Sequence, residues 1–227
     1  MRTIIIVGGS KGIGNALLQL LVKSHNVINI SRSEPKITHE NLHHIACDVI
    51  SGELPNIEKA DGLIYCPGSI NLKPINRLNI DDFKNDFEIN VLGAVKVIQK
   101  YLTILKQGQN PSIVLFSTVA SKLGMPFHAS IATAKSGVEG LVKSLGAELA
   151  PTIRVNAIAP TVTHTELASK LLRNDRMIEN ITERHPLKKY LMPKEVAEMA
   201  SFLMSNKANS ISGQIFDLDC GIVSFKI

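Results

Sequence analysis

The fold is decided by residues 3–14, which read TIIIVGGSKGIG. Residues 4–7 are apolar and mostly β-branched, which is typical of a strand buried on both faces. Three glycines follow at the spacing Gly8-x3-Gly12-x-Gly14, and residues 15–22 then place leucines three and four apart, as in a helix. The sequence therefore predicts a strand, a glycine turn and a helix in that order.

Each glycine of the turn has its own physical reason. Gly8 allows a sharp exit from the strand, and Gly12 lets the backbone approach a pyrophosphate because no Cβ stands in the way. Gly14 lets the helix pack closely on the strand. A purely structural turn is the alternative. The strand–helix context favours phosphate binding, because a helix N-terminus presents free N–H groups and a positive dipole end.

The composition predicts one globular α/β domain over residues 1–227. The chain is 44% hydrophobic and 20% charged, with a formal net charge of +5. Scattered Lys and Arg, only 4% aromatic residues and no Trp argue against a nucleic-acid partner.

Cys47, Cys66 and Cys220 lack the spacing of a disulfide framework or zinc site, so no metal is expected. No apolar run suits a membrane span or signal peptide, which predicts a cytoplasmic protein without a membrane partner.

Strand and helix patterns alternate along the rest of the chain. This alternation predicts a doubly wound parallel sheet with helices on both faces. Strands are expected at 26–30, 43–47, 61–65, 112–116, 153–158 and 214–218, and helices within 82–106 and at 130–149 and 193–205. The connection between residues 48 and 61 leaves room for a turn or two of helix. Residues 161–192 follow the carboxyl end of a strand, so we predict a substrate lid there, with a helix pair that only caps the sheet as the alternative.

From about Ile4 to Gly221, the chain resembles the short-chain dehydrogenase/reductase family. The glycine turn looks like the cofactor loop of that family, Asp48-Val49 like its adenine-contacting pair, and Asn90 like its helix asparagine. The resemblance implies a single Rossmann-type sheet of seven strands in the order 3-2-1-4-5-6-7. It also implies a bound nicotinamide dinucleotide.

Residues 154–160, RVNAIAP, resemble the family's strand that ends in a Pro-Gly turn. Thr161 stands where glycine is usual, and Thr165 fits the threonine that often follows the turn. Near the last strand, Cys220 also occupies a usual glycine position. The resemblance places the cofactor against the following residues: Gly8, Ser10, Lys11, Gly12, Ile13, Gly14, Ser31, Arg32, Asp48, Val49, Cys66, Pro67, Gly68, Lys135, Pro160, Val162 and Thr165.

Charge at the end of the second strand favours NADP over NAD. An acidic residue there would bind the ribose hydroxyls of NAD and repel a 2′-phosphate. Ser31 occupies that position, Arg32 follows it, and Lys11 lies in the glycine loop. Two cations without an acid suit the third phosphate of NADP. The alternative is that both cations are ordinary solvated charges.

The catalytic half departs from the family pattern. The family uses a tyrosine as proton donor, a lysine four residues later that binds the nicotinamide ribose and lowers the tyrosine pKa, and a serine that holds the substrate oxygen. Lys135 matches the lysine and Thr118 keeps a hydroxyl at the serine position, but Ile131 replaces the tyrosine. Residues four apart share a helix face, so Ile131 is expected to face the cofactor with no proton to give.

His128 is a candidate substitute for the tyrosine, because the enoyl reductase branch of the family carries its tyrosine seven residues before the lysine. An imidazole with a pKa near ~6.5 can protonate a substrate at neutral pH. Pro126 and Phe127 indicate a loop there, where a histidine is more often simply exposed. A water held near Asn90 is the other candidate for the proton.

Two functions stay open at this point. The first is an NADP-dependent oxidoreductase that reduces a carbonyl or activated double bond of a small organic substrate, with Thr118, Lys135, Asn90 and His128 as catalytic candidates. The second is a catalytically impaired or regulatory NADP-binding protein on the same fold, which Ile131 motivates.

The long helices around residues 91–105 and 138–149 carry apolar residues on more than one face. Family members commonly pair these helices between subunits, so we expect a homodimer or homotetramer. The alternative is that these helices only cover the sheet.

Overall fold

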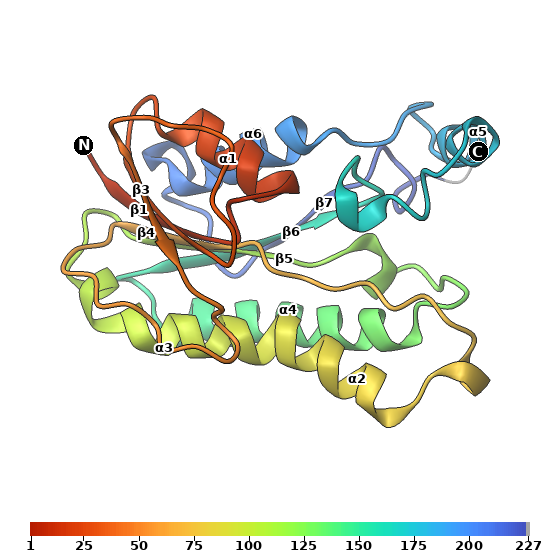
Figure 1. The fold of residues 1–227 in the computed structure, drawn as a ribbon, viewed down its shortest axis with the longest axis horizontal. Helices are drawn as coiled ribbons and strands as arrows, with labels where there is room; N and C mark the ends of the chain where they lie inside the picture. Colours follow the sequence, from red (N-terminus) through yellow and green to blue (C-terminus); the bar gives the residue numbers. More distant parts are fainter. Residues whose placement is uncertain (226–227) are drawn as a thin grey trace.

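Seven parallel strands form one sheet through the middle of the protein (Figure 1). In this computed structural model, which describes residues 1–225, the strand order is β3-β2-β1-β4-β5-β6-β7. The predicted order is therefore confirmed. The strands are β1 (Thr3–Val7), β2 (Asn26–Ser31), β3 (Leu42–Ala46), β4 (Gly62–Tyr65), β5 (Ser112–Phe116), β6 (Arg154–Pro160) and β7 (Ile215–Leu218).

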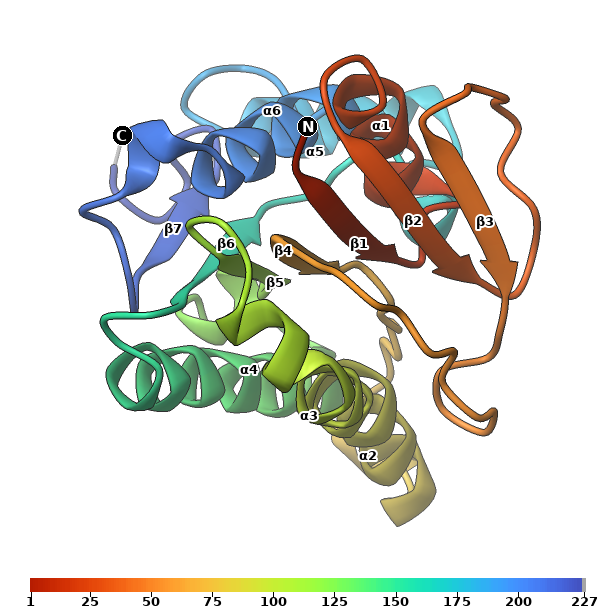
Figure 2. The same ribbon diagram turned by 90° about the vertical axis from the view of Figure 1, so that its left-hand side faces the viewer.

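Helices cover both faces of the sheet (Figures 1 and 2). On one face lie α1 (Gly12–Leu21) and α6 (Pro193–Met204), and on the other lie α2 (Ile80–Phe87), α3 (Gly93–Lys106) and α4 (Ala129–Glu148). The side chains of β1 alternate between the two cores. Ile4 and Ile6 join the α1–α6 side, whereas Ile5 and Val7 join the α3–α4 side. This confirms the predicted strand buried on both faces.

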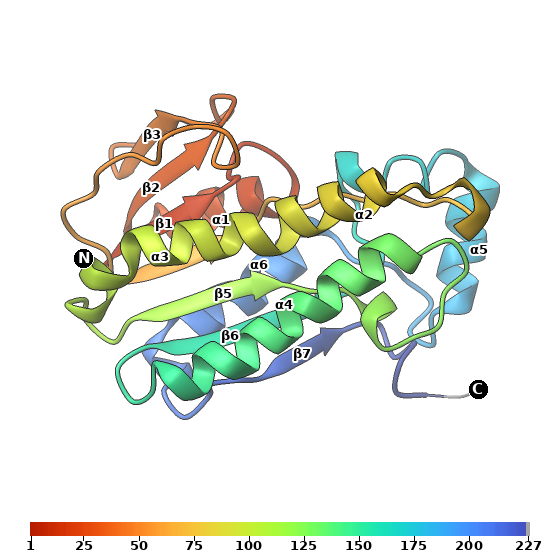
Figure 3. The same ribbon diagram turned by 90° about the horizontal axis from the view of Figure 1, so that it is seen from below.

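Helices α2 and α3 lie end to end (Figure 3), joined by a π-helical turn over Glu88–Leu92. The sequence predicts one long helix within 82–106 and gives no sign of this turn. A π turn inserts an extra residue into a helix and is often found at functional sites. Here it carries Asn90, whose side chain is almost completely buried.

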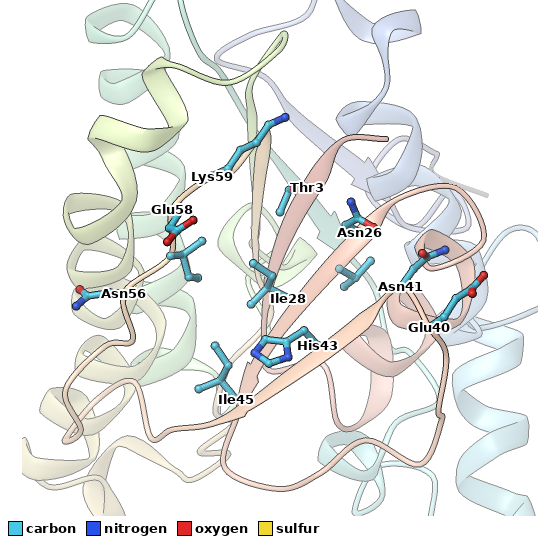
Figure 4. Close-up of a pocket in the computed structure, with 12 residues that line it drawn as sticks. Thr3, Asn26, Ile28, Glu40, Asn41, His43, Ile45, Asn56, Glu58 and Lys59 are labelled. Atoms are coloured by element: carbon cyan, nitrogen blue, oxygen red, sulfur yellow. The ribbon is translucent and has the colours of Figure 1, made fainter.

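The connection between β3 and β4, where the sequence leaves room for at most a turn or two of helix, forms no helix. Without that cover, a cavity of about 590 Å³ opens beside β2 and β3 (Figure 4). Thr3 and Asn26, the first residues of β1 and β2, line it together with His43 of β3 and Lys59 of the connection. Ligands of such sheets bind at the carboxyl ends of the strands, and this cavity reaches the amino ends.

Segment 161–192 contains a short 3-10 helix (Glu166–Ala168) and one α-helix, α5 (Asp175–Arg184), which lies beyond the end of the sheet (Figure 1). None of the residues of α5 is fully buried. The loop before α5 and the loop after it run back to the sheet, where Thr163 forms an isolated parallel bridge with Leu191. None of the helices formed by residues 1–225 is both long and apolar enough to cross a lipid bilayer.

Candidate active site

The glycine turn joins β1 to α1 at the carboxyl end of the sheet. Gly8 and Gly12 have φ angles of +79° and +51°, in the left-handed region that favours glycine. A Cβ on Gly14 would lie 2.2 Å from the carbonyl oxygen of Gly8, so α1 packs directly on the turn. These contacts agree with the reasons that the sequence suggests for Gly8 and Gly14.

The N-terminus of α1 has no side-chain cap. The N-cap residue, Lys11, makes no capping hydrogen bond, and the first turn of the helix holds no acidic residue. The first N–H groups of a helix have no partner within the helix, and the positive end of the helix dipole adds to their attraction for anions. The turn therefore suits a phosphate group.

Hydroxyl groups gather beside this turn at the end of β2. The buried Ser31 donates its hydroxyl proton to the carbonyl of Ser33 (2.9 Å), and Ser33 Oγ donates to Ser10 Oγ (3.0 Å). Arg32 is exposed next to them. Lys11 is also exposed, but its Nζ pairs with the Glu166 carboxylate at 2.7 Å. Of the two cations predicted to bind the third phosphate, Lys11 and Arg32, Lys11 already has an anionic partner from segment 161–192.

The predicted adenine-contacting pair follows β3. Asp48 Oδ1 accepts a hydrogen bond from the backbone N–H of Ile50 at 3.0 Å, which holds the turn after the strand. The Val49 side chain is buried in the core on the α3–α4 side. Any contact between Val49 and an adenine would therefore be made largely by its backbone.

The loop after β4 connects the glycine turn to the catalytic candidates. Pro67 lies against Gly8, since a Cβ on Gly8 would come within 3.1 Å of Pro67 Cδ. A Cβ on Gly68 would lie 3.2 Å from Asn90 Oδ1 and 3.7 Å from Lys135 Nζ. Burial raises the pKa of the neighbouring Cys66 thiol to about 12, so this thiol is protonated and unreactive. Gly68 thus marks the point where the two halves of the site meet.

A cavity of about 170 Å³ lies beside Gly68. It brings together Thr118, His128 and Lys135 of the predicted catalytic set with Ile131, and segment 161–192 lines its other side. Of the predicted cofactor residues, Ile13, Cys66, Gly68, Lys135, Pro160, Val162 and Thr165 line it as well. The remaining predicted residues are not part of its lining: Gly8, Ser10, Lys11, Gly12, Gly14, Ser31, Arg32, Asp48, Val49, Pro67 and Asn90.

Lys135 is buried on α4, and its Nζ donates to the carbonyl oxygen of Phe116 at 2.7 Å. Burial lowers the pKa of this lysine to about 8, while the negative charge of Asp86 acts in the opposite direction. Ile131 lies one helical turn earlier, is only 3% exposed and lines the same cavity. The shared face expected for Ile131 and Lys135 is present, and nothing on Ile131 can exchange a proton.

The hydroxyl available to a substrate is that of Thr118. Thr118 is partly exposed, and its Oγ1 accepts a long hydrogen bond from Ala120 N at 3.3 Å. The neighbouring Ser117 also lines the cavity, but its hydroxyl donates to the Glu139 carboxylate at 2.6 Å. Thr118 is thus the hydroxyl with the weaker protein contact.

His128 immediately precedes α4, in the loop that the sequence predicts. Its Nδ1 lies 2.7 Å from the carbonyl oxygen of Pro126. A carbonyl can only accept, so Nδ1 carries a proton, and Nε2 carries one only in the imidazolium form. His128 can therefore act as an acid through Nε2 when it is cationic.

Sequence reasoning missed three polar residues of this site, Asp86, Ser69 and Ser130. Asn90 Nδ2 donates to Ser69 Oγ at 2.9 Å, and both Ser69 and Ser130 donate to the Asp86 carboxylate. Asn90 Oδ1 is buried and has no hydrogen-bond partner among residues 1–225. The spacing of four between Asp86 and Asn90 is the signal in the sequence, because it places both on one helix face.

Within the described part of the chain, no three His, Cys, Asp or Glu side chains are grouped so that they could hold a metal ion.

Comparison with known proteins places this site in a family. Residues 46–223 match the family described as Enoyl-(Acyl carrier protein) reductase. The 3-oxoacyl-(acyl-carrier-protein) reductase FabG of Rickettsia conorii is 29% identical over 235 residues, which span 98% of this chain and 97% of that protein. The 2,5-dichloro-2,5-cyclohexadiene-1,4-diol dehydrogenase of Sphingobium indicum is 29% identical over 244 residues, again 98% and 97% of the two chains.

Solved structures of other proteins share the fold of this chain. A short chain dehydrogenase family protein from Francisella tularensis has a TM-score of 0.89 at 26% identity, covering 99% of this chain and 100% of its own. ElxO, solved with NADP bound, has a TM-score of 0.88 at 24% identity, with the same coverage of the two chains. The chain belongs to the short-chain dehydrogenase/reductase family.

Proposed function

We propose that this protein is an NADP(H)-dependent oxidoreductase that reduces a carbonyl, or an activated double bond, of a small organic substrate. The observation that carries the proposal is the meeting of two groups of residues at Gly68. The glycine turn contacts Pro67 on one side of Gly68, and Asn90 and Lys135 lie against Gly68 itself. When bound, the dinucleotide supplies the hydride.

The residues present fit such a cofactor. Gly12 and the uncapped α1 N-terminus suit the pyrophosphate, and the absence of a Cβ at Gly68 leaves space beside Lys135 Nζ and the unpaired Asn90 Oδ1. Ser10, Ser31 and Arg32 provide hydroxyls and a cation where NADP carries its extra phosphate. We therefore propose NADP as the cofactor, and NAD as the less favoured one.

The substrate-facing residues suit a small, largely apolar molecule with one carbonyl oxygen. Ile131, Leu167 and Leu171 line the cavity with hydrocarbon. Thr118 Oγ1 would donate to the carbonyl oxygen and orient it, and Lys135 would bind the nicotinamide ribose. The proton would come from the His128 imidazolium or from a water held near Asn90.

NADPH oxidation, followed for purified protein with ketones, β-ketoacyl thioesters, quinones and enoyl thioesters, tests the proposal. We expect turnover with at least one class, and loss of that turnover in Lys135→Met and Thr118→Ala. Thr118→Ser keeps the hydroxyl and is the matched control, so it should retain activity. Oxidation that persists in both Lys135→Met and Thr118→Ala would contradict the assigned roles.

A second candidate function rests on Ile131. A protein that binds NADPH and lacks the phenol could be catalytically impaired and act as a regulatory dinucleotide-binding protein. NADPH binding without oxidation on any substrate class would favour this candidate over the reductase.

We also propose that copies of the chain associate as a homodimer or homotetramer in the cytoplasm, with no nucleic-acid or membrane partner. Phe87 and Leu92, at the junction of α2 and α3, are 40% and 51% exposed and could be covered by a second copy. Light scattering that gives the mass of a monomer at micromolar concentration would contradict the association.

A further inference from the structure

Asp86 is a charged residue of α2 with no exposed surface, and the roles proposed above do not use it. Its Oδ1 accepts hydrogen bonds from Ser69 Oγ and from Asn71 Nδ2 (3.0 Å), and its Oδ2 accepts one from Ser130 Oγ (2.6 Å). Three donors thus hold both oxygens of this buried carboxyl group. Burying a charged group is costly unless something compensates it.

The donors connect Asp86 to the catalytic cavity. Ser69 lines that cavity and also accepts a hydrogen bond from Asn90 Nδ2 at 2.9 Å. Asn90 Nδ2 donates to the backbone carbonyl of Asp86 as well, at 2.7 Å. Ser130 is the residue before Ile131 on α4. Asp86 thus contacts the residue next to the position where the family pattern has its tyrosine.

Lys135 is also a buried charged residue, and its positive charge likewise needs compensation. The only hydrogen bond that its Nζ makes to the described residues is to the carbonyl of Phe116, and Ile131, one turn earlier, provides neither charge nor hydroxyl. The ionisable groups around it are Asp86 on α2, the Cys66 thiol after β4, His128 just before α4, and Glu139 on α4 itself. Glu139 accepts hydrogen bonds from Ser117 and Ser121, and burial raises the pKa of the Cys66 thiol, which keeps it neutral. Of the two carboxyl groups, Asp86 is the one whose charge acts on Lys135.

We propose that Asp86 is a positioning residue of the active site, the buried anion that keeps Lys135 in its ammonium form and holds Ser69 and Asn90 in place where a tyrosine is missing. Burial alone lowers the pKa of Lys135, and the Asp86 charge opposes that change. An ammonium group can donate hydrogen bonds to ribose hydroxyls and stabilise negative charge that develops on a substrate oxygen, whereas a neutral amine stabilises such charge far less.

The direct test is a pH titration of Lys135 by NMR in protein labelled with ¹³C at lysine Cε, with the signal assigned by its loss in Lys135→Arg. In Asp86→Asn, the midpoint should fall by about one pH unit relative to the unaltered protein. Asp81→Asn is the matched control, because Asp81 lies on the same helix with a side chain 77% exposed, and it should leave the midpoint unchanged. An unchanged midpoint in folded Asp86→Asn would overturn the proposal.

If Asp86→Asn does not fold, Lys135→Met provides the second test. With the buried cation removed, the double variant Asp86→Asn/Lys135→Met should be more stable than Asp86→Asn, as measured by urea titration. A double variant no more stable than Asp86→Asn would mean that Asp86 only connects α2 to α4.

The kinetic consequence rests on the proposed reductase function, but the titrations do not. If the protein oxidises NADPH, Asp86→Asn should lower kcat about tenfold and leave the KM for substrate almost unchanged. The alkaline limb of the pH–rate profile should move down by the same amount as the Lys135 midpoint. Absence of turnover in the unaltered protein would refute the proposed function and leave the titration to decide the role of Asp86.

Discussion

The two ends of the active site are built in different ways. The glycine turn is shaped by backbone features, namely the left-handed φ angles of Gly8 and Gly12 and the N-terminus of α1. The end beside α4 is formed by side chains, and there Ile131 stands in place of the expected tyrosine while Lys135 is present and buried. A binding function carried by backbone geometry can persist when the side chains that perform the chemistry change. The difference leads to four predictions, from the largest expected effect to the smallest.

Restoring the phenol would make the second end resemble the family pattern. Ile131→Tyr places a hydroxyl in the cavity one turn before Lys135, which can then lower the tyrosine pKa. A positioned general acid contributes about 10²–10⁴-fold to a rate. We therefore expect kcat for NADPH oxidation to rise by about 10²-fold or more, measured with the best substrate found.

The matched control is Ile131→Phe, which adds the same ring without the hydroxyl and should give no gain. An equal gain in both variants would show that ring volume and not proton transfer limits the rate. No gain in either would indicate that Thr118 and Lys135 are not aligned for catalysis.

A second change is aimed at the backbone end. Gly14→Ala would place a Cβ 2.2 Å from the carbonyl oxygen of Gly8, so α1 has to move away from the turn. Such overpacking costs about 3 kcal/mol in the free energy of unfolding, measured by urea titration. Gly124→Ala is the control, because a Cβ there meets nothing within 4 Å. Equal stabilities for the two variants would contradict the close packing of α1 on the turn.

Arg32→Ala tests which dinucleotide the turn prefers. Loss of one charge-assisted hydrogen bond to a 2′-phosphate should weaken NADPH binding about tenfold, or ~1.4 kcal/mol. NADH lacks that phosphate, so its Kd should stay the same. An equal loss of affinity for both dinucleotides, measured by calorimetry, would mean that Arg32 does not distinguish NADPH by its 2′-phosphate.

The smallest effect concerns the exposed ion pair between Lys11 and Glu166. The Lys11 ammonium, through its hydrogen bond, lowers the pKa of the Glu166 carboxyl, so the pair is ionised at neutral pH. Glu166→Gln should release Lys11 toward the 2′-phosphate and tighten NADPH binding about twofold at low salt, an effect that salt screens. Weaker NADPH binding would show that Glu166 contacts the cofactor itself.

Local signals made the fold predictable. The β1–turn–α1 unit is encoded within residues 3–22, and the alternation of strands and helices indicated a parallel sheet. The strand order came from the family resemblance. The sequence did not predict the helix-free face beside β2 and β3, because a short connection does not reveal whether it will form a helix. Cys220 adopts φ of +52°, in agreement with its place at a usual glycine position of the family.

The site was less predictable, because its polar contacts join distant parts of the chain. Asn29 accepts a hydrogen bond from the N–H of Gly9 at 3.0 Å and supports the glycine turn from another strand. Lys11 meets Glu166 across 155 positions, and Ser130 meets Asp86 across 44. A sequence pattern places residues on a helix or strand, but only packing decides which of them touch.

The most direct test of the account is calorimetric titration of the purified protein with NADPH and with NADH. We predict that NADPH binds with a Kd in the micromolar range and at least about tenfold more tightly than NADH, because Arg32 and Ser10 would contact the extra phosphate. Tighter binding of NADH, or no heat with either dinucleotide, would contradict it.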